Sequence, residues 1–259
     1  MPQLHCRPMG SRAARKGSVL IGTSGWTYRD WRGPFYPADV PQRCWLEFYA
    51  RQFPSTEING SFYRTPSLQA VEGWRDAVPD GFLFAWKASK FITHWKRLTN
   101  PDNSLALIRE RLDLLGDKAG PVLFQLPPRM RADRERLAGF LKRLPRRWHV
   151  AFEFRHLSWY DDAILTLLAE HDTALCLSDH HDAPAPWIAT ARHVYVRAHG
   201  PRGDYAGRYH GRTLGALARR VALWRRAGRQ VFVYFDNDQK SAAPQDAQRL
   251  RALVDRRGA

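Results

Sequence analysis

The stretch HVAFEFRHLSWYDDAILTLLAEHDTALCLS, residues 149–178, contains one complete strand–helix–strand unit. His149–Phe154 and Thr173–Ser178 are short apolar runs of the length and residue types that predict β-strands. Asp161–His171, which lies between them, predicts an α-helix. Two strands joined through a helix run parallel in one sheet, so this stretch predicts a βαβ unit as the building block of the fold.

The same alternation repeats along the chain. Eight strand-like runs occur in order: Val19–Thr23, Thr56–Phe62, Phe82–Lys87, Pro121–Leu126, His149–Phe154, Thr173–Ser178, His193–Ala198 and Gln230–Phe235. Most are followed by a helix-like stretch, and these are Cys44–Gln52, Leu68–Asp76, Ser104–Leu115, Arg134–Arg143, Asp161–His171, Leu214–Ala227 and Pro244–Val254. The pattern predicts the α/β class and a single (β/α)8 TIM barrel over residues 18–259. Asp179–Arg192, which contains Pro184 and Pro186, is expected to lack a full helix.

Length and composition limit the class of protein. The 259 residues suit one barrel domain, which typically needs about 250. An apolar share of 44% and an aromatic share of 12% exclude a disordered or low-complexity chain. No apolar run approaches the roughly 20 residues of a membrane span, so no membrane partner is expected. Residues 1–17 are basic, lack the apolar core of a secretory signal, and are expected to form a disordered tail.

Charge and cysteine usage bear on partners and compartment. The formal net charge is +16, from 41 basic and 25 acidic residues. This excess either attracts nucleic acid or another polyanion, or reflects a compositional bias toward arginine, and both interpretations stay open. The three cysteines, Cys6, Cys44 and Cys176, form no disulfide or zinc pattern, and Cys176 is expected in the core. Such usage favours a reducing compartment, so we expect a cytoplasmic protein.

Period-two alternation places polar residues on one face of several predicted strands. Helices must cover the apolar face, so the polar face points into the barrel. The polar set is Glu57, Asn59, Ser61, Lys87, Gln125, Glu153, Arg155, Tyr195, Arg197, His199, Asp236 and Asn237. Buried charges of this kind require a partner or a ligand. One interpretation is internal pairing, of Glu153 with Arg155 or Arg197 and of Glu57 with Lys87.

Many spaced motifs resemble those of the YecE-like family, a TIM-barrel domain of unknown function catalogued as DUF 72. They run in order from about residue 18 to 254: GTSGWTY (22–28), WRGPFYP (31–37), EINGSFYR (57–64), Lys87 with ITH (92–94), LFQLPP (123–128), AFEFRHLSW (151–159), YVRAHG (195–200), YAGRY (205–209) and YFDN (234–237). The resemblance implies a TIM barrel and no established reaction. The chain departs from the family at Asp236-Asn237, where paired asparagines are usual, and in residues 238–248, which lack its glycine and asparagine.

Active sites of TIM barrels lie at the C-terminal ends of the strands, in the loops that lead to the helices. Six of the ten histidines follow predicted strand ends: His94, His156, His180, His181, His199 and His210. So do five tryptophans: Trp26, Trp31, Trp95, Trp159 and Trp187. Aromatic residues at this face either stack on a sugar or base, or form a core beneath long loops, and the sequence leaves both open.

Glu57, Glu153 and His199 are the candidate catalytic residues. Two carboxylates across a barrel mouth suit glycoside chemistry, with internal ion pairing as the alternative. Glu57, Glu153, Asp179 and His199 would also suit a divalent metal, but Lys87, Arg155 and Arg197 in the same interior would repel it. We therefore assign no metal ligands. No phosphate-binding or dinucleotide fingerprint is present, so no cofactor is expected.

The glycine-rich loop after the seventh strand, HGPRGDYAGRYHG (199–211), favours an anion site. Arg197, Arg202 and Arg208 offer forked donors for phosphate or carboxylate, unless Asp204 only tethers the loop. We expect Arg197 to point inward and to bind an oxyanion through two hydrogen bonds. The candidate ligand-binding residues are Trp26, Asn59, Tyr63, Lys87, Gln125, Arg155, Trp159, Arg197, Tyr205, Tyr209 and Asn237.

The sequence therefore favours a protein that binds a small phosphate-bearing or sugar-like ligand in a polar pocket at the C-terminal face. Cleavage or isomerisation of that ligand is left open, as is whether the protein is an enzyme at all. The alternatives are a nucleic-acid-binding or repair protein, and a metal-dependent sugar isomerase or hydrolase.

Overall fold

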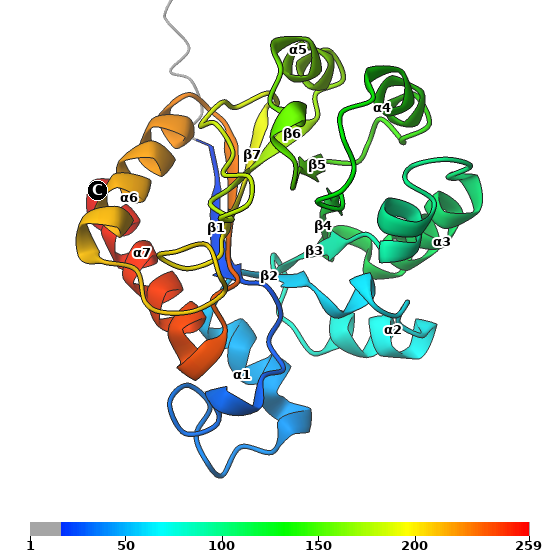
Figure 1. Ribbon diagram of the computed structural model, residues 1–259. Helices are drawn as coiled ribbons and strands as arrows, with labels where there is room; N and C mark the ends of the chain where they lie inside the picture. The colour runs from blue at the N-terminus through cyan, green and yellow to red at the C-terminus, as the bar shows by residue number, and fades with distance from the viewer. Residues whose placement is uncertain (1–16, 259) are drawn as a thin grey trace, which may run out of the picture.

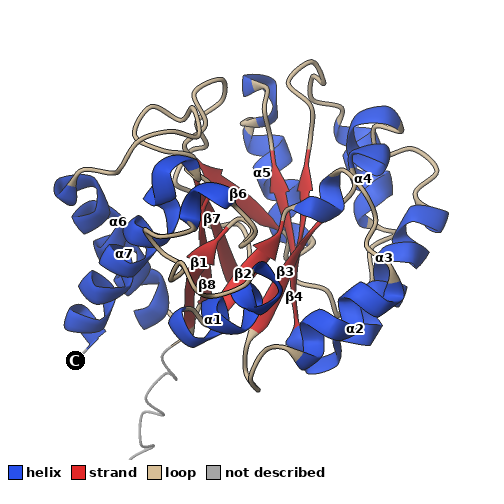
Figure 2. Ribbon diagram, turned by 90° about the horizontal axis from the view of Figure 1, so that it is seen from below, coloured by secondary structure: helices blue, strands red, loops and turns tan. Residues whose placement is uncertain are grey.

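A computed structural model describes residues 17–258, and its centre is a parallel sheet of eight strands surrounded by helices (Figures 1 and 2). Residues 1–16, which hold nearly all of the predicted disordered tail, lie outside the described residues. The strands are β1 (Val19–Thr23), β2 (Ser55–Ile58), β3 (Leu83–Lys87), β4 (Ala119–Gln125), β5 (Val150–Glu153), β6 (Ala174–Ser178), β7 (His193–Ala198) and β8 (Gln230–Phe235). Their order in the sheet is β1-β8-β7-β6-β5-β4-β3-β2. The predicted TIM barrel is confirmed.

The helices form the outer layer of the barrel (Figure 1). They are α1 (Trp45–Gln52), α2 (Leu68–Asp76), α3 (Asp102–Leu115), α4 (Arg134–Leu141), α5 (Asp162–Glu170), α6 (Gly211–Arg226) and α7 (Ala242–Gly258). Residues 179–192, all of them described, contain no helix, as the prolines of that segment predict. None of the helices in the described range is long and apolar enough to cross a bilayer.

The second strand is shorter than the sequence predicts. It ends at Ile58, and Asn59 adopts helical backbone angles that lead into a 3₁₀ turn over Gly60–Phe62. The Ser61 hydroxyl lies 2.6 Å from the carbonyl oxygens of both Ile58 and Lys87, and its single proton is donated to these acceptors. Ser61 was expected on the interior face of a strand that continued to Phe62, and this prediction is wrong. The run Asn59-Gly60-Ser61 consists of residues whose local hydrogen bonds favour turns over strand pairing.

Alternation along the strands separates two apolar clusters. The barrel interior holds Leu20, Ala85, Leu123, Ala151, Ala174, Cys176, Tyr195, Phe232 and Tyr234. Residues of the opposite phase, such as Phe124, Phe152 and Val196, belong to the larger core between sheet and helices. Inside the barrel, small side chains at Ala85, Ala151 and Ala174 leave room for the rings from β7 and β8. The polar residues that lie two positions further along these strands, such as Glu153 after Ala151 and Arg197 after Tyr195, also point into the interior. They lie nearer the C-terminal ends of the strands than the apolar cluster does.

The barrel closes between β1 and β2 without a regular ladder. Seven strand pairs form ladders, and the remaining junction has one bridge, between Ser24 and Glu57. The amide of Gly25 donates to the Glu57 carbonyl at 2.8 Å, and the Thr56 hydroxyl donates to the Thr23 carbonyl at 3.0 Å. Gly22 makes this close approach possible, because a Cβ there would lie 1.9 Å from the Ser55 carbonyl oxygen.

We expect Gly22→Ala to lower the free energy of unfolding by about 3 kcal/mol or more, because the added methyl group collides with backbone that cannot move without opening the barrel. Urea unfolding measures this loss. Gly139→Ala is the matched control: Gly139 lies in α4 with open space around it, and helix propensity predicts a gain of about 0.5–1 kcal/mol. Equal effects of the two changes would contradict this account of barrel closure.

Candidate functional site

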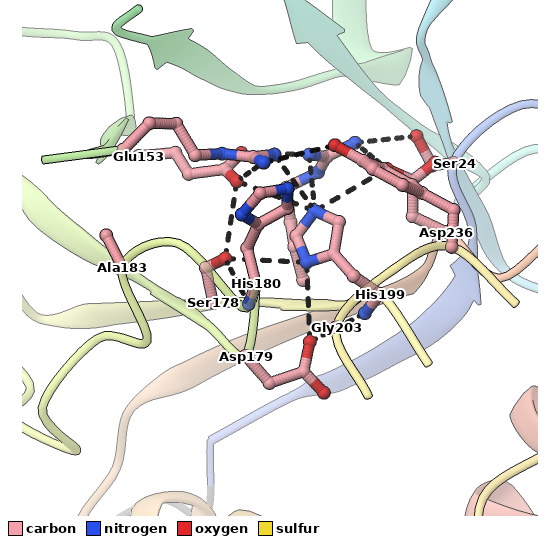
Figure 3. A network of polar contacts seen from close by, with 12 residues as sticks. Ser24, Glu153, Ser178, Asp179, His180, Ala183, His199, Gly203 and Asp236 are labelled. Atoms are coloured by element: carbon pink, nitrogen blue, oxygen red, sulfur yellow. Dashed lines mark hydrogen bonds and ion pairs between the residues drawn. The ribbon is translucent and has the colours of Figure 1, made fainter. Parts of the chain in front are cut away.

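The centre of the polar interior is the guanidinium of Arg197, which is fully buried near the end of β7. Its Nε donates to Glu57 Oε2 at 3.1 Å, and its Nη2 donates to Glu57 Oε1 at 2.9 Å. Nη2 also donates to Asp236 Oδ2 and Nη1 donates to Glu153 Oε2, both at 2.8 Å. One arginine thus binds Glu57 on β2, Glu153 at the end of β5 and Asp236 directly after β8, and part of this network is drawn in Figure 3. We call Arg197, Glu57, Glu153 and Asp236 the central ion cluster.

Neighbouring hydroxyls complete the hydrogen bonding of Glu57. Tyr195 donates to its Oε2 at 2.6 Å, and Ser24 donates to its Oε1 at 2.5 Å. Burial disfavours the charge on Arg197, but Asp236, Glu57 and Glu153 outweigh burial and raise the pKa of the guanidinium. Burial would raise the pKa of Glu153, but the charges of Arg155 and Arg197 hold it well below its usual range. The charged forms of Arg197 and Glu153 are therefore favoured, and the cluster is internally paired.

This arrangement decides between the interpretations of the buried charges. Glu153 pairs with both predicted partners, since Arg155 Nη2 lies 2.6 Å from its Oε1. Glu57 pairs with Arg197 instead of Lys87, so that predicted pair is wrong. Every nitrogen of the Arg197 guanidinium donates to a side chain of the protein, where we expected an external oxyanion. Arg197, Glu57 and Glu153 have no solvent exposure, so the interior is a packed network rather than the polar pocket we expected.

His199, two residues after Arg197, is held in one orientation. Its backbone amide donates to Asp179 Oδ1 at 2.7 Å, and its Nδ1 lies 3.3 Å from the same oxygen (Figure 3). Its Nε2 lies 3.1 Å from Arg197 Nη1 and 3.2 Å from Arg155 Nη2. Guanidinium groups only donate, so Nε2 is the acceptor and the proton resides on Nδ1, facing Asp179.

Lys87 ends β3 at the edge of the central ion cluster, and it is buried without an ion-pair partner. Its Nζ donates to Asn59 Oδ1 at 3.0 Å and lies 4.6 Å from the centre of the Phe62 ring. Among residues 17–258, no carboxylate oxygen lies within 4.0 Å of this nitrogen. Burial, assisted by the charge of Arg197, lowers the pKa of Lys87 to about 8.

Arg155 and Tyr205 form the next part of this edge. Arg155 Nη1 donates to the Tyr205 hydroxyl at 3.1 Å, whereas its Nε is buried and has no partner in the described part of the chain. Tyr205 adopts a φ of +67°, which residues other than glycine rarely adopt. Its ring packs edge-on against His199. Such local strain is common where a binding site fixes a side chain.

The remaining predicted site residues divide into two groups. Asn59 and Gln125 are half-buried beside Lys87 and Glu153, and Tyr63 is exposed on the loop that follows β2. Four others hold loops in place and do not line the edge: Trp26, Trp159, Tyr209 and Asn237. Trp159, for example, is fully buried, stacks on Phe154 and donates to the Met130 carbonyl. Of the two interpretations of the loop tryptophans, the loop core applies to Trp159.

Within the described part of the chain, the structure brings together one set of metal-type ligands that sequence reasoning missed. His180, His181 and Asp182 each place a ligand atom within 4.8 Å of the others. Burial and the charge of Arg155 lower the pKa of His180 to about 4, so its imidazole is neutral as a metal ligand must be. Adjacent residues with this composition suit zinc or another transition metal, and the dipeptide His-His before an aspartate was the available signal. By contrast, Glu57, Glu153 and His199 all face arginines.

The family described as "Protein of unknown function DUF72" matches residues 20–259. The chain belongs to the DUF72 family. A curated relative, the UPF0759 protein YunF of Bacillus subtilis, is 24% identical over 92% of this chain and 95% of its own.

Solved structures of DUF72 proteins share the fold. One from Thermotoga maritima is 25% identical, covers 92% of this chain and 99% of its own, and has a TM-score of 0.82. Another, from Enterococcus faecalis, is 19% identical, covers 92% of this chain and 95% of its own, and has a TM-score of 0.76. The barrel of this DUF72 protein is therefore the barrel of its family.

We expect Arg197→Met to lower the free energy of unfolding by about 3–5 kcal/mol near neutral pH, because three buried carboxylates lose their shared partner. Without Arg197 these carboxylates are buried with less compensating positive charge, and acidification relieves the cost of burying their negative charge. The difference in the free energy of unfolding between wild type and variant should therefore become smaller as the pH falls from about 7.5 to about 5. Urea unfolding at both pH values measures it, and a deficit that is unchanged or larger at pH 5 would contradict the account.

Proposed function

We propose that this DUF72 protein binds a small oxyanion-bearing ligand, either phosphate-bearing or sugar-like with an acidic group, at the edge of the central ion cluster. The observation that supports this proposal is the ammonium of Lys87, which is buried and makes a single hydrogen bond within residues 17–258, to a neutral amide. An ammonium has three donors, so two remain for a ligand. A desolvated, unpaired cation destabilises the folded chain, and anion binding accounts for its presence.

Neighbouring side chains supply further donors in a suitable place. Lys87 ends β3, Gln125 ends β4 and Arg155 follows β5, so the three come from consecutive strands and share the interior phase. Arg155 keeps an unpartnered Nε, which supports a second contact to an oxyanion. The amides of Asn59 and Gln125 can donate to, and accept from, the hydroxyl groups of a sugar.

The proposal is limited to binding, because the candidate catalytic groups are engaged. Glu57 and Glu153 direct their oxygens at Arg197 and Arg155, and His199 directs its acceptor nitrogen at the same two arginines. A general base must have its acceptor atom within hydrogen-bond reach of the substrate proton. The geometry therefore supports an electrostatic role for these residues, in which they hold the arginines in place.

A phosphate titration tests the proposal. We expect inorganic phosphate and glucose 6-phosphate to raise the thermal stability of the wild type, by about 2.7 kcal/mol in free energy when the ligand is a hundredfold above its Kd. Lys87→Met should abolish this stabilisation. Lys142→Met, which removes one exposed positive charge from the end of α4, should retain it. Equal stabilisation of all three proteins, or of none, would reject the site.

Lys87 also makes a prediction without any ligand. Its folded pKa of about 8 lies below its ordinary value of 10.5, so the charged form is disfavoured by folding. This penalty is fully present below about pH 8 and fades as the pH rises toward 10.5. Lys87→Met should therefore be more stable than wild type near pH 7, by up to roughly 3 kcal/mol, and the difference should narrow as the pH rises. Urea unfolding across this range checks the sign, and a variant that is less stable at pH 7 would contradict it.

A further inference from the structure

A row of aromatic rings and ammonium groups continues outward from Lys87 to the protein surface. Its members come from the loops after β2 and β3, which are neighbouring strands. We call Phe62, Tyr63, Lys90, Trp95, Phe91 and Lys96 the aromatic–lysine row. The two most exposed rings in it are Tyr63, at 67%, and Trp95, at 68%.

Pairs of rings alternate with single lysines along the row. The rings of Phe62 and Tyr63 have centres 5.1 Å apart. Lys90 Nζ lies 5.6 Å from the centre of the Tyr63 ring and 5.6 Å from that of Trp95. The Trp95 ring packs against Phe91 at 5.8 Å, and Lys96 Nζ lies 5.1 Å from the Phe91 ring. Every lysine of the row therefore lies beside a π-face, where an approaching anion and a flat ring can be bound together.

The backbone that carries the row is unusual. Phe91–Trp95 is one turn of π-helix, a rare conformation that is frequent at functional sites. Arg97, Leu98 and Asn100, which follow directly, all have φ between +44° and +68° although none is glycine. Backbone strain of this kind persists where the surrounding structure fixes a segment, and it concentrates at ligand-binding positions.

The two loops that carry the row contain charged residues of one sign. Residues 59–67 and 88–101, which contain the whole row, include Arg64, Lys90, Lys96 and Arg97 and no aspartate or glutamate. The partner that complements this surface is therefore anionic. Two exposed aromatic faces in addition indicate that this partner presents flat rings as well as negative charges.

We propose that the aromatic–lysine row binds single-stranded nucleic acid without sequence preference. Unpaired bases stack on Tyr63 and Trp95, and backbone phosphates approach Lys90 and Lys96. Alternation of ring and charge is the repeating chemistry of a nucleotide strand, and proteins that bind single strands combine exposed aromatic rings with basic grooves. A duplex hides its bases and a lipid surface presents no rings, so neither uses the stacking faces. This surface is separate from the proposed oxyanion site at Lys87, and either proposal can fail alone.

The test is fluorescence anisotropy of a labelled oligothymidylate of about 12 nucleotides, titrated with the full-length protein from about 50 to 200 mM salt. We expect affinity to fall with salt, and Tyr63→Ala and Trp95→Ala each to weaken binding about fivefold or more. The intrinsic fluorescence of Trp95 should be quenched by the bound strand. Lys90→Gln combined with Lys96→Gln should weaken binding and make the salt dependence shallower.

Two matched controls lie on another face of the molecule. Trp187 is also exposed and lies under Arg220, so Trp187→Ala removes an equivalent tryptophan–cation pair. Arg219→Gln combined with Arg226→Gln removes two exposed charges from α6. Both control variants should bind the oligonucleotide like wild type. All of these side chains are wholly or partly exposed, so the variants should fold, which circular dichroism verifies.

Several results would overturn the proposal. No binding at the lowest salt concentration would do so, as would equal weakening by the control variants. Binding of heparin or of a DNA duplex as tight as that of the single strand, and unaffected by Tyr63→Ala and Trp95→Ala, would show a purely electrostatic surface. Tyr63- and Trp95-dependent binding to anionic lipid vesicles, in the absence of oligonucleotide binding, would assign the row to a membrane surface.

Discussion

The interior of this barrel is organised around one guanidinium. Arg197 takes up the carboxylates of Glu57, Glu153 and Asp236, which come from three other strands, and it also donates to Ser24 after β1. A buried ion cluster contributes little net stability compared with a well-packed apolar core, but leaving any of its members unpaired is costly. The cluster therefore acts mainly as a constraint: these strand ends must stay in a fixed relation, or a charge is left buried alone.

That constraint shapes where a ligand can be recognised. The carboxylates of the cluster already neutralise the charge of Arg197 and accept from its nitrogens. Arg197 therefore has no donor left for an external anion. The proposed oxyanion site therefore lies at the edge, where Lys87 has no carboxylate partner among the described residues and Arg155 pairs with Glu153. The protein thus separates a fully paired charge at the centre from incompletely paired, buried charge at the edge, and removal of Arg197 and removal of Lys87 should have opposite effects on stability.

Much of this architecture was predictable from the sequence, because the alternation of polar and apolar residues along each strand determines which side chains point into the barrel. The phase that puts Glu153 and Arg197 inward also puts Phe152 and Val196 under the helices, and the structure has both. Which carboxylate meets which cation was not predictable for Glu57, because pairing across a barrel depends on strand stagger, which no local pattern encodes. The turn at Gly60–Phe62 overrode a β-like run by local hydrogen bonding. The aromatic–lysine row was not predicted, because Tyr63 and Lys90 are distant in sequence and only the pairing of β2 with β3 brings their loops together.

The junction between β1 and β2 has a consequence beyond barrel closure. Strands that part at this junction become two free edges, and an unpaired edge is a template on which a strand from another molecule can add. An inward-pointing charge on an edge strand opposes such addition, because the incoming chain would have to bury it. Glu57 occupies that position on β2, bound to Arg197 while the barrel is closed and exposed as a bare charge if it opens. The carboxylate of Glu57, which binds Arg197 in the closed barrel, would therefore oppose self-association of molecules whose barrel has opened.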